Sequence, residues 1–303
     1  SMLLSALCTL IVSYTFLTSN PAGTVIEIPL WTWFQVGDFA PSFGLSFDGL
    51  ALTMTGVITG IGFLIHLFAA WYMKGETGFA RFFSYMNLFV ASMLLLVLAD
   101  NLFLLYLGWE GVGICSYLLI GFYFQRDTAI FANLKAFLVN RVGDFGFVLG
   151  IALVLAHFGG SLNYADVFAA APGLKDATIQ LFPGVDWSLM TVTCLLLFVG
   201  AMGTSAQFPL HVWSPDSMEG PTPISALIHA ATMVTAGIFM VSRMSPLYEM
   251  STVALNVIVV IGAITALFMG FLGLIQTDIK RVVAYSTLSQ LGYMTVALGV
   301  SAY

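Results

Sequence analysis

Long apolar runs separated by short polar breaks dominate the chain. Crossing the hydrocarbon layer of a bilayer takes about 20 apolar residues, because the layer is roughly 30 Å thick and a helix rises about 1.5 Å per residue. Backbone groups cannot stay unpaired in lipid, and the runs are too long for barrel strands, so each run predicts a helix. Nine runs qualify, at about 1–18, 48–73, 82–99, 101–124, 131–157, 188–218, 222–247, 253–275 and 282–302.

Composition indicates the same class. Hydrophobic residues make up 59% of the 303 residues and charged residues 8%, whereas soluble domains carry about a quarter charged residues. The outer surface must therefore face lipid, and we predict an all-α, polytopic membrane protein. The net charge of −6 argues against nucleic acid as a partner. The spacing of the 3 cysteines indicates neither a metal site nor a disulfide framework.

Basic residues in the loops predict the orientation, because Lys and Arg are enriched on the cytoplasmic side. The two long loops, about 19–47 and 158–187, fall on the opposite side and suit caps at the membrane interface. With spans that alternate in direction, the cytoplasmic side holds Lys74, Arg81, Arg126, Lys280 and Arg281.

Since the chain opens on Ser1 rather than on methionine, we expect a piece of a longer protein.

Glu110 is an ionisable residue near the middle of a predicted span, where a charge costs about 3 kcal/mol or more. Helical spacing places it on one stripe with Tyr106, Gly113 and Tyr117. The stripe combines hydroxyl groups, a carboxylate and a small residue at which water or another helix can approach. We favour a proton-binding carboxylate, and the alternative is a carboxylate that only ties two helices together.

Other buried ionisable groups are a charge pair and two histidines. Arg141 and Asp144 lie three residues apart, so they can meet on one helix face, either for proton transfer or only to neutralise each other. His229 is a candidate proton relay, since histidine changes charge near neutral pH. It shares a stripe with hydroxyl-bearing residues, and hydrogen-bonded filler is the alternative. For His66, which has apolar and small neighbours, both interpretations stay open.

The run 188–218 is interrupted in its middle. Proline removes a backbone donor and clashes with the preceding turn. Broken helices at membrane depth are tolerated where they are buried or line a hydrated cavity, so this break predicts an ion pathway. The interrupting residues are Gly200, Gly203, Ser205, Gln207 and Pro209.

Four stretches carry long motifs: Ser-Ala-Gln-Phe-Pro-Leu-His at 205–211, Met-Glu-Gly-Pro-Thr-Pro through Ala-Thr-Met-Val at 218–234, Tyr-Leu-Gly-Trp-Glu-Gly-Val-Gly at 106–113, and Thr-Asp-Ile-Lys-Arg-Val-Val-Ala-Tyr-Ser-Thr at 277–287. They resemble the antiporter-like subunits of complex I, the proton-pumping NADH:quinone oxidoreductase, and Mrp-type Na⁺/H⁺ antiporters. Phe-Asp-Gly-Leu at 47–50 and Asn-Arg-Val-Gly-Asp at 140–144 favour the family of the subunit called L in bacteria. The resemblance covers nearly the whole chain.

This resemblance implies an antiporter-like bundle holding the family's second to tenth helices. N-terminal helices would occupy 1–99, a first five-helix repeat 100–247, and the start of a second repeat 248–303. It implies a membrane-arm subunit that carries protons and has no redox cofactor or metal of its own, with FMN, iron–sulfur clusters and quinone in partner subunits. Expected partners are other antiporter-like and small membrane subunits, phospholipids and protons. The expected location is a bacterial inner membrane, with the mitochondrial inner membrane as the alternative.

The resemblance also assigns site residues. Glu110 and His229 match the family's helix-five glutamate and helix-eight histidine, and Arg141 with Asp144 matches charged positions of helix six. Thr204 stands where the family usually has a lysine that pairs with the glutamate. Threonine cannot carry charge near neutral pH, so another cation or a water chain substitutes, or this half-channel is impaired or engineered. Supporting positions are Tyr106, Tyr117, Ser205, Gln207, Pro209, Ser225 and Thr232, and the cytoplasmic connection holds Asp278, Lys280 and Arg281.

Two other functions stay open. The first is a subunit of an Mrp-type Na⁺/H⁺ antiporter, which the proteins that co-purify with the chain would distinguish. The second is a structural subunit that does not pump, in which Thr204 marks a lost channel.

Overall fold

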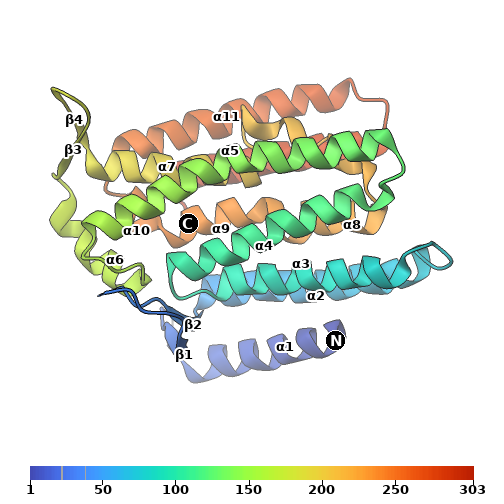
Figure 1. The fold of residues 1–303 in the computed structure, drawn as a ribbon, viewed down its shortest axis with the longest axis horizontal. Coiled ribbons are helices and arrows are strands. Elements are labelled where there is room, and N and C mark those ends of the chain that lie inside the picture. The colour runs from blue at the N-terminus through green and yellow to red at the C-terminus, as the bar shows by residue number, and fades with distance from the viewer. Residues whose placement is uncertain (22, 38) are drawn as a thin grey trace.

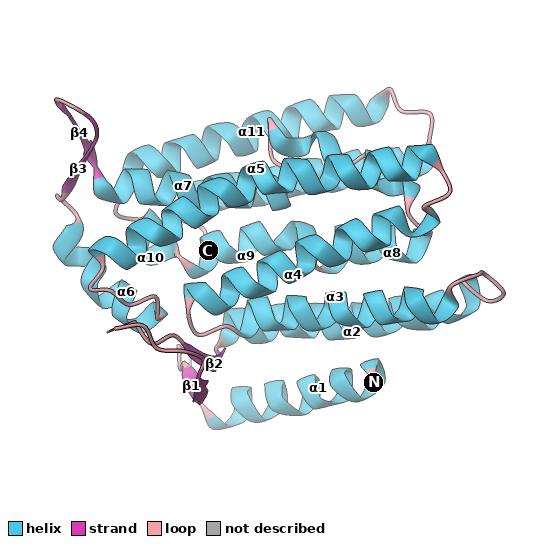
Figure 2. Ribbon diagram, viewed as in Figure 1, coloured by secondary structure: helices cyan, strands magenta, loops and turns pink. Residues whose placement is uncertain are grey.

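Helices lying side by side make up most of the structure, and their connections gather at two opposite ends of the bundle (Figure 1). The computed structural model describes residues 1–21, 23–37 and 39–303. Figure 2 places the strands at one of these ends. The long helices are α1 (Met2–Ser19), α2 (Gly49–Tyr72), α3 (Phe79–Leu98), α4 (Leu102–Ile120), α5 (Asp127–His157), α7 (Leu189–Thr204), α11 (Thr252–Leu274) and α12 (Ile279–Gly299).

Each predicted run contains helix, and within the described residues 7 helical segments are long and apolar enough to cross a membrane. The predicted all-α membrane fold is therefore confirmed. The two remaining runs differ from the others. Helix α7 has only 16 residues, because its run is broken, and in α12 two charged residues, Lys280 and Arg281, directly follow the first residue, Ile279.

The two long loops lie at the same end of the bundle, as predicted, and each contains a strand pair (Figure 1). Strand β1 (Ile26–Thr32) pairs antiparallel with β2 (Ser42–Phe47), and β3 (Thr178–Phe182) pairs antiparallel with β4 (Val185–Ser188). These strands were not predicted. The alternation of polar and apolar residues in Thr-Ile-Gln-Leu-Phe was the signal for the third. The loop 158–187 also holds α6 (Tyr164–Ala170) and η2 (Ala171–Leu174).

The loops after α2, α4 and α11 lie together at the opposite end (Figure 1). The basic residues that predict the cytoplasmic side are therefore at one end of the bundle, and we refer to it as the basic end. The shorter elements near it are η1 (Gly121–Tyr123), η3 (Leu210–Trp213), η4 (Asp216–Glu219), α8 (Thr222–Ala226) and the π-helical turn η5 (Leu227–Ala231). The same segment continues through η6 (Met233–Thr235), α9 (Ala236–Arg243) and α10 (Ser245–Tyr248).

Helix α7 ends in a left-handed cap rather than at its glycines. Ala206 has φ of +49° and donates its N–H to the carbonyl of Gly203, at 3.2 Å. The N–H of Gln207 reaches the carbonyl of Met202, at 2.9 Å, which completes a Schellman motif. The break thus begins just before Pro209, whose ring could not continue the helix.

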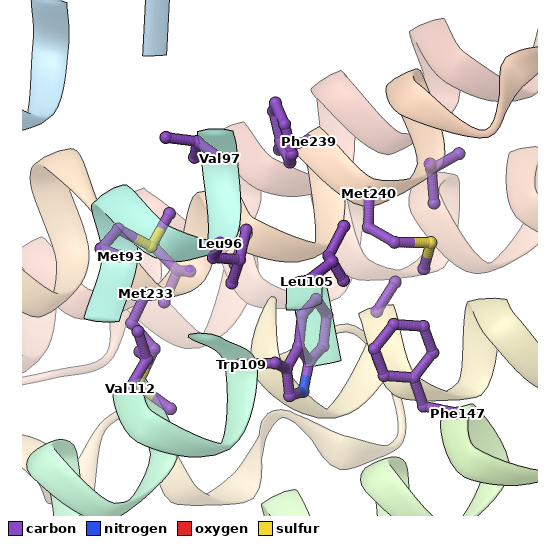
Figure 3. Packing of buried hydrophobic residues seen from close by; sticks show 14 of the residues in the cluster. Met93, Leu96, Val97, Leu105, Trp109, Val112, Phe147, Met233, Phe239 and Met240 are labelled. Carbon is purple, nitrogen blue, oxygen red and sulfur yellow. The ribbon is translucent and has the colours of Figure 1, made fainter. Parts of the chain in front are cut away.

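The glycines of this run serve helix packing instead. A Cβ added to Gly143 on α5 would lie 2.9 Å from the Cα of Gly203 on α7, and a Cβ on Gly200 would lie 2.6 Å from the Cβ of Phe147. Only glycine permits so close an approach of the two backbones. Around this contact, Figure 3 shows Trp109, Phe147 and neighbouring apolar side chains filling the core, with the two ring centres 4.7 Å apart.

An ion pair ties α2 to α9 at the strand end. Asp48 caps α2 by accepting the N–H of Ala51, at 2.8 Å, and it pairs with both terminal nitrogens of Arg243. Only 9% of the Arg243 side chain is exposed. Burial acts to raise the pKa of Asp48, but the Arg243 and Ala51 hydrogen bonds outweigh it, and the folded-state pKa lies below the ordinary 3.8.

Asp48→Asn is expected to lower the free energy of unfolding by about 3 kcal/mol, because it keeps the helix cap but leaves a buried guanidinium without its counter-charge. Because the folded-state pKa is depressed, this stabilisation is complete above about pH 4 and is lost as the pH falls further. Thermal unfolding in mild detergent at several pH values measures both effects. The control is Asp166→Asn, an exposed carboxylate that accepts from Ser161. Equal shifts of the unfolding temperature in both variants would show that the ion pair of Asp48 with Arg243 does not stabilise the fold.

Candidate functional site

Glu110, Arg141 and Asp144 form one partly buried cluster between α4 and α5. The guanidinium of Arg141 pairs with Glu110 through Nη1, and the same nitrogen lies 3.5 Å from Asp144 Oδ2. The hydroxyl of Tyr106 donates to Glu110 Oε1, at 2.5 Å. The indole N–H of Trp109 donates to Asp144 Oδ1, at 2.7 Å. Two carboxylates therefore share one cation, and two neutral donors hold their remaining oxygens.

The three members of the cluster differ in burial. The side chains of Asp144, Glu110 and Arg141 are 8%, 18% and 30% exposed. The Arg141 guanidinium also stacks on the ring of Phe137, with its carbon 4.6 Å from the ring centre. Three of the four carboxylate oxygens accept a hydrogen bond, and the fourth, Asp144 Oδ2, lies 3.5 Å from Arg141 Nη1.

Arg141 supplies the positive charge beside Glu110 that Thr204 cannot supply. Helix spacing predicts only the pair of Arg141 with Asp144, which is confirmed, and the structure adds Glu110 from a neighbouring helix. Thr204 is buried, and within the described chain no hydrogen bond joins it to Glu110. A cation other than the missing lysine thus pairs with Glu110.

Other predicted members of the stripe and the break lie outside this cluster. The ring of Tyr117 packs edge-on against Phe137, and its hydroxyl makes no hydrogen bond to Glu110 in the described chain. Gln207 donates to the carbonyl of Ser205, at 3.1 Å. The N–H of Phe208, between Gln207 and Pro209, donates to Thr265 on α11, at 2.9 Å. The break therefore anchors to α11 rather than to Glu110.

His229 sits in the π-helical turn η5 and is 5% exposed. Its Nε2 lies 2.9 Å from the hydroxyl of Ser217, and that hydroxyl donates its single proton to the carbonyl of Ser214, at 2.5 Å. The histidine must then donate from Nε2, which fixes its tautomer. Its Nδ1 has no hydrogen-bond partner in the described chain and keeps a free lone pair.

A cavity of about 320 Å³ lies beside His229. Ser225 and Lys280 contribute to its wall, as the stripe and the predicted cytoplasmic connection suggest. Thr232 does not. The wider π turn changes the spacing, and the hydroxyl of Thr232 bonds back to the carbonyl of Leu227, at 2.7 Å. The prediction of one unbroken helix with a single polar stripe was therefore wrong beyond His229.

The short turn η4 connects His229 to the basic end. Asp216 pairs with Lys135 of α5, at 2.7 Å, and with Arg281 of α12, at 3.5 Å. Lys280 donates to the carbonyls of Met218 and Gly220, at 2.6 and 3.0 Å, while Asp278 caps α12. Ser217, in the same turn, holds His229, so the predicted cytoplasmic connection contacts the histidine through η4.

A packed path joins the two polar sites. The indole of Trp213 stacks near the ring of His229, with centres 6.4 Å apart, and its N–H donates to the carbonyl of Gly203, at 2.9 Å. Gly203 in turn touches Gly143, one residue before Asp144. His66 lies apart on α2, where its Nδ1 bonds the carbonyl of Gly62, at 2.7 Å, and its Nε2 has no hydrogen-bond partner in the described chain.

Ser217→Ala is expected to release the tautomer of His229 and to lower the free energy of unfolding by about 1–3 kcal/mol, because a buried ring nitrogen loses its partner. Nitrogen-15 NMR of the histidine ring should change from an Nε2–H signal to a mixture. The matched control is Ser214→Ala, since the buried Ser214 hydroxyl has no partner in the described chain. An unchanged histidine spectrum in Ser217→Ala would contradict the assignment.

The residues predicted from the sequence do not include Trp109, Ser217 and Lys135. Trp109 stood next to Glu110, and its indole N–H in a membrane span is a donor that needs an acceptor. Lys135 lies near the predicted cytoplasmic side, where a basic residue is common, so its position alone does not indicate an ion pair. For Ser217 the sequence carries no signal, because Ser214 has the same chemistry and is buried three residues earlier.

Comparisons with known proteins agree with the fold. The family profile described as NADH:quinone oxidoreductase/Mrp antiporter, TM, matches residues 99–303, and that described as NADH-Ubiquinone oxidoreductase (complex I), chain 5 N-terminus, matches residues 33–83. NADH-quinone oxidoreductase subunit L of Neisseria meningitidis serogroup A is 66% identical over 300 residues, which are 99% of this chain and 44% of the relative. Subunit L of Escherichia coli is 52% identical, over 99% of this chain and 47% of its own length.

Solved structures give the same fold. A chain of the Mrp complex from Dietzia matches with a TM-score of 0.80 and 28% identity, over 98% of this chain and 31% of that chain. An archaeal membrane-bound sulfane sulfur reductase matches with a TM-score of 0.80 at 23% identity, covering 98% of this chain and 58% of that chain, and so supports the fold alone. This chain spans less than half the length of the curated relatives given above. The chain belongs to the NADH:quinone oxidoreductase/Mrp antiporter family, in its complex I subunit L branch.

Proposed function

We propose that this chain carries protons through the membrane as part of a membrane-arm subunit of NADH:quinone oxidoreductase. The cluster of Glu110, Arg141 and Asp144 supports this most strongly. With both carboxylates ionised the cluster has one excess negative charge, and with one bound proton it is neutral. Because an unpaired charge inside the bilayer costs about 3 kcal/mol or more, this composition favours the uptake of one proton.

His229 is the second proposed proton-binding group. Its Nδ1 lone pair is available because Ser217 occupies the other ring nitrogen. The adjoining cavity, with Lys280 in its wall, would admit water from the basic end. A proton taken up by His229 would then be exchanged with the cluster through water or a rearranged side chain.

The packed path from His229 through Trp213 and Gly203 to Gly143 offers a physical route for coupling. A shift of η4, driven by neighbouring subunits, would move Ser217 and Trp213 together. It would thereby change both the hydrogen bond of His229 and the packing beside Asp144. The proposed coupling is therefore conformational, with the charges as the proton carriers.

We assign the redox chemistry, with its FMN, iron–sulfur clusters and quinone, to partner subunits, and the location to a bacterial inner membrane. The Mrp antiporter alternative has less support, since the Mrp chain is 28% identical and the subunit L relatives are 52% and 66% identical. Against a purely structural subunit, Arg141 supplies the cation that Thr204 cannot.

The test is to purify the chain with its partners in mild detergent and to measure NADH-driven proton uptake in inverted membrane vesicles. The proposal expects NADH-oxidising subunits in the preparation and proton uptake that an uncoupler abolishes. Small Mrp-type partners with sodium-dependent proton exchange would instead assign the chain to an antiporter. Electron transfer without any proton uptake would refute pumping.

A further inference from the structure

We propose that the basic end carries a binding site for the headgroup of one anionic phospholipid, formed by Arg81 and Arg126. This site is separate from the proton-transfer groups and does not depend on the proposed function. It lies where the loop between α2 and α3 meets the loop between α4 and α5.

Two guanidinium groups line a cavity of about 420 Å³ at this place. The central carbon of Arg81 lies 5.1 Å from the ring centres of both Phe122 and Phe124, and that of Arg126 lies 4.6 Å from the ring centre of Tyr123. Stacking on a ring uses the face of a guanidinium and leaves its N–H groups available to a phosphate. The aromatic rings therefore hold both arginines in place for an anion.

Neither arginine has a carboxylate partner within the described residues. The ion pairs found there use Arg141, Arg243 and Arg281, but not Arg81 or Arg126. Glu76 also lines the cavity and forms no salt bridge with either. The site thus has two cations against one anion and an excess positive charge.

A second cavity, of about 210 Å³, continues from the first and shares Arg81, Phe122 and Phe124 with it. Asn133 lies in its wall, is 8% exposed, and has an Oδ1 with no hydrogen-bond partner in the described chain. A buried amide oxygen left unpaired costs about 1–3 kcal/mol. A headgroup hydroxyl or ammonium in this cavity would supply the missing donor.

The position along the bundle identifies the anion as a lipid rather than free phosphate. The second cavity extends from Arg81 to Tyr85, one helical turn further into the span α3. Exposed aromatic residues surround the same level, as at a membrane–water interface. Basic pockets between helices at this depth suit anionic headgroups. These aromatic residues are Trp71, Tyr72, Phe79 and Phe124.

Native mass spectrometry of the detergent-purified protein, titrated with phosphatidylglycerol, tests the site. Each Arg→Gln change should weaken retention of one lipid about fivefold, and Arg81→Gln with Arg126→Gln should weaken it at least about tenfold. Asn133→Ala should cause a smaller loss. The control is Lys74→Gln, which removes an exposed charge of the same end that lines neither cavity.

Equal retention of phosphatidylglycerol by the parent and the double variant would overturn the proposal. Equal binding of phosphatidylcholine would overturn the assignment of an anionic lipid. Displacement of the lipid by millimolar inorganic phosphate would make this a free-anion site instead. Thermal unfolding without added lipid checks that the variants are folded. If the double variant is unfolded, Arg126→Gln alone is compared with the parent.

Discussion

Glu110→Gln stops proton translocation through this chain while the fold remains intact, if Glu110 carries the proton. Glutamine has nearly the same shape and can still bond Tyr106 and Arg141, but it cannot take up or release a proton at any physiological pH. Removal of a proton-carrying side chain should slow this step at least about a hundredfold. The readout is the number of protons moved per NADH oxidised in inverted vesicles that contain the assembled complex.

The control for this change is Glu249→Gln, an exposed carboxylate after α10. It should leave both the proton ratio and the midpoint of thermal unfolding unchanged. If Glu110→Gln pumps at the parental ratio, Glu110 serves only to tie α4 to α5. In that case the structural alternative for this carboxylate is correct.

Arg141→Gln is the change with the largest expected effect on stability. It removes the cation that Glu110 and Asp144 share and leaves a buried and a partly buried carboxylate without their counter-charge. Removing one partner of a buried ion pair costs about 3–5 kcal/mol, and here two partners are affected. Thermal unfolding should therefore occur at a clearly lower temperature, and proton translocation should fall as well.

A second substitution separates charge balance from lost packing. Arg141→Gln combined with Asp144→Asn leaves Glu110 as the one charged group. The cluster then carries one excess negative charge, as it does in the parent. Stability should then recover in part, which a double-mutant cycle quantifies as a favourable coupling. No recovery in the double variant would show that Arg141 acts by packing on Phe137 rather than by charge.

Local features of the sequence predicted the spans and the buried charges well. Hydropathy acts over about 20 consecutive residues, so the position of each span is encoded locally. The pair of Arg141 and Asp144 was also predictable, because three residues along a helix bring them to one face. The break before Pro209 followed from proline chemistry in the same way.

Contacts between helices were not predictable in this manner. Glu110 and Arg141 are 31 residues apart and meet only because α4 packs on α5. The tight approach of α5 to α7 depends on Gly143 and Gly203, which the sequence analysis did not interpret as a packing pair. The π turn at His229 is wider than an α-helical turn, so it moves Thr232 off the predicted stripe. The local sequence carries no signal of this wider turn.

The measurement that tests the proton-binding cluster most directly is infrared difference spectroscopy of the reconstituted protein between acidic and alkaline pH. A cluster that binds one proton predicts a protonated-carboxyl C=O stretch that titrates in the parent and disappears in Glu110→Gln or Asp144→Asn. If the same titrating band persists in both variants, or if no such band exists in the parent, the cluster holds no exchangeable proton and does not carry protons across the membrane.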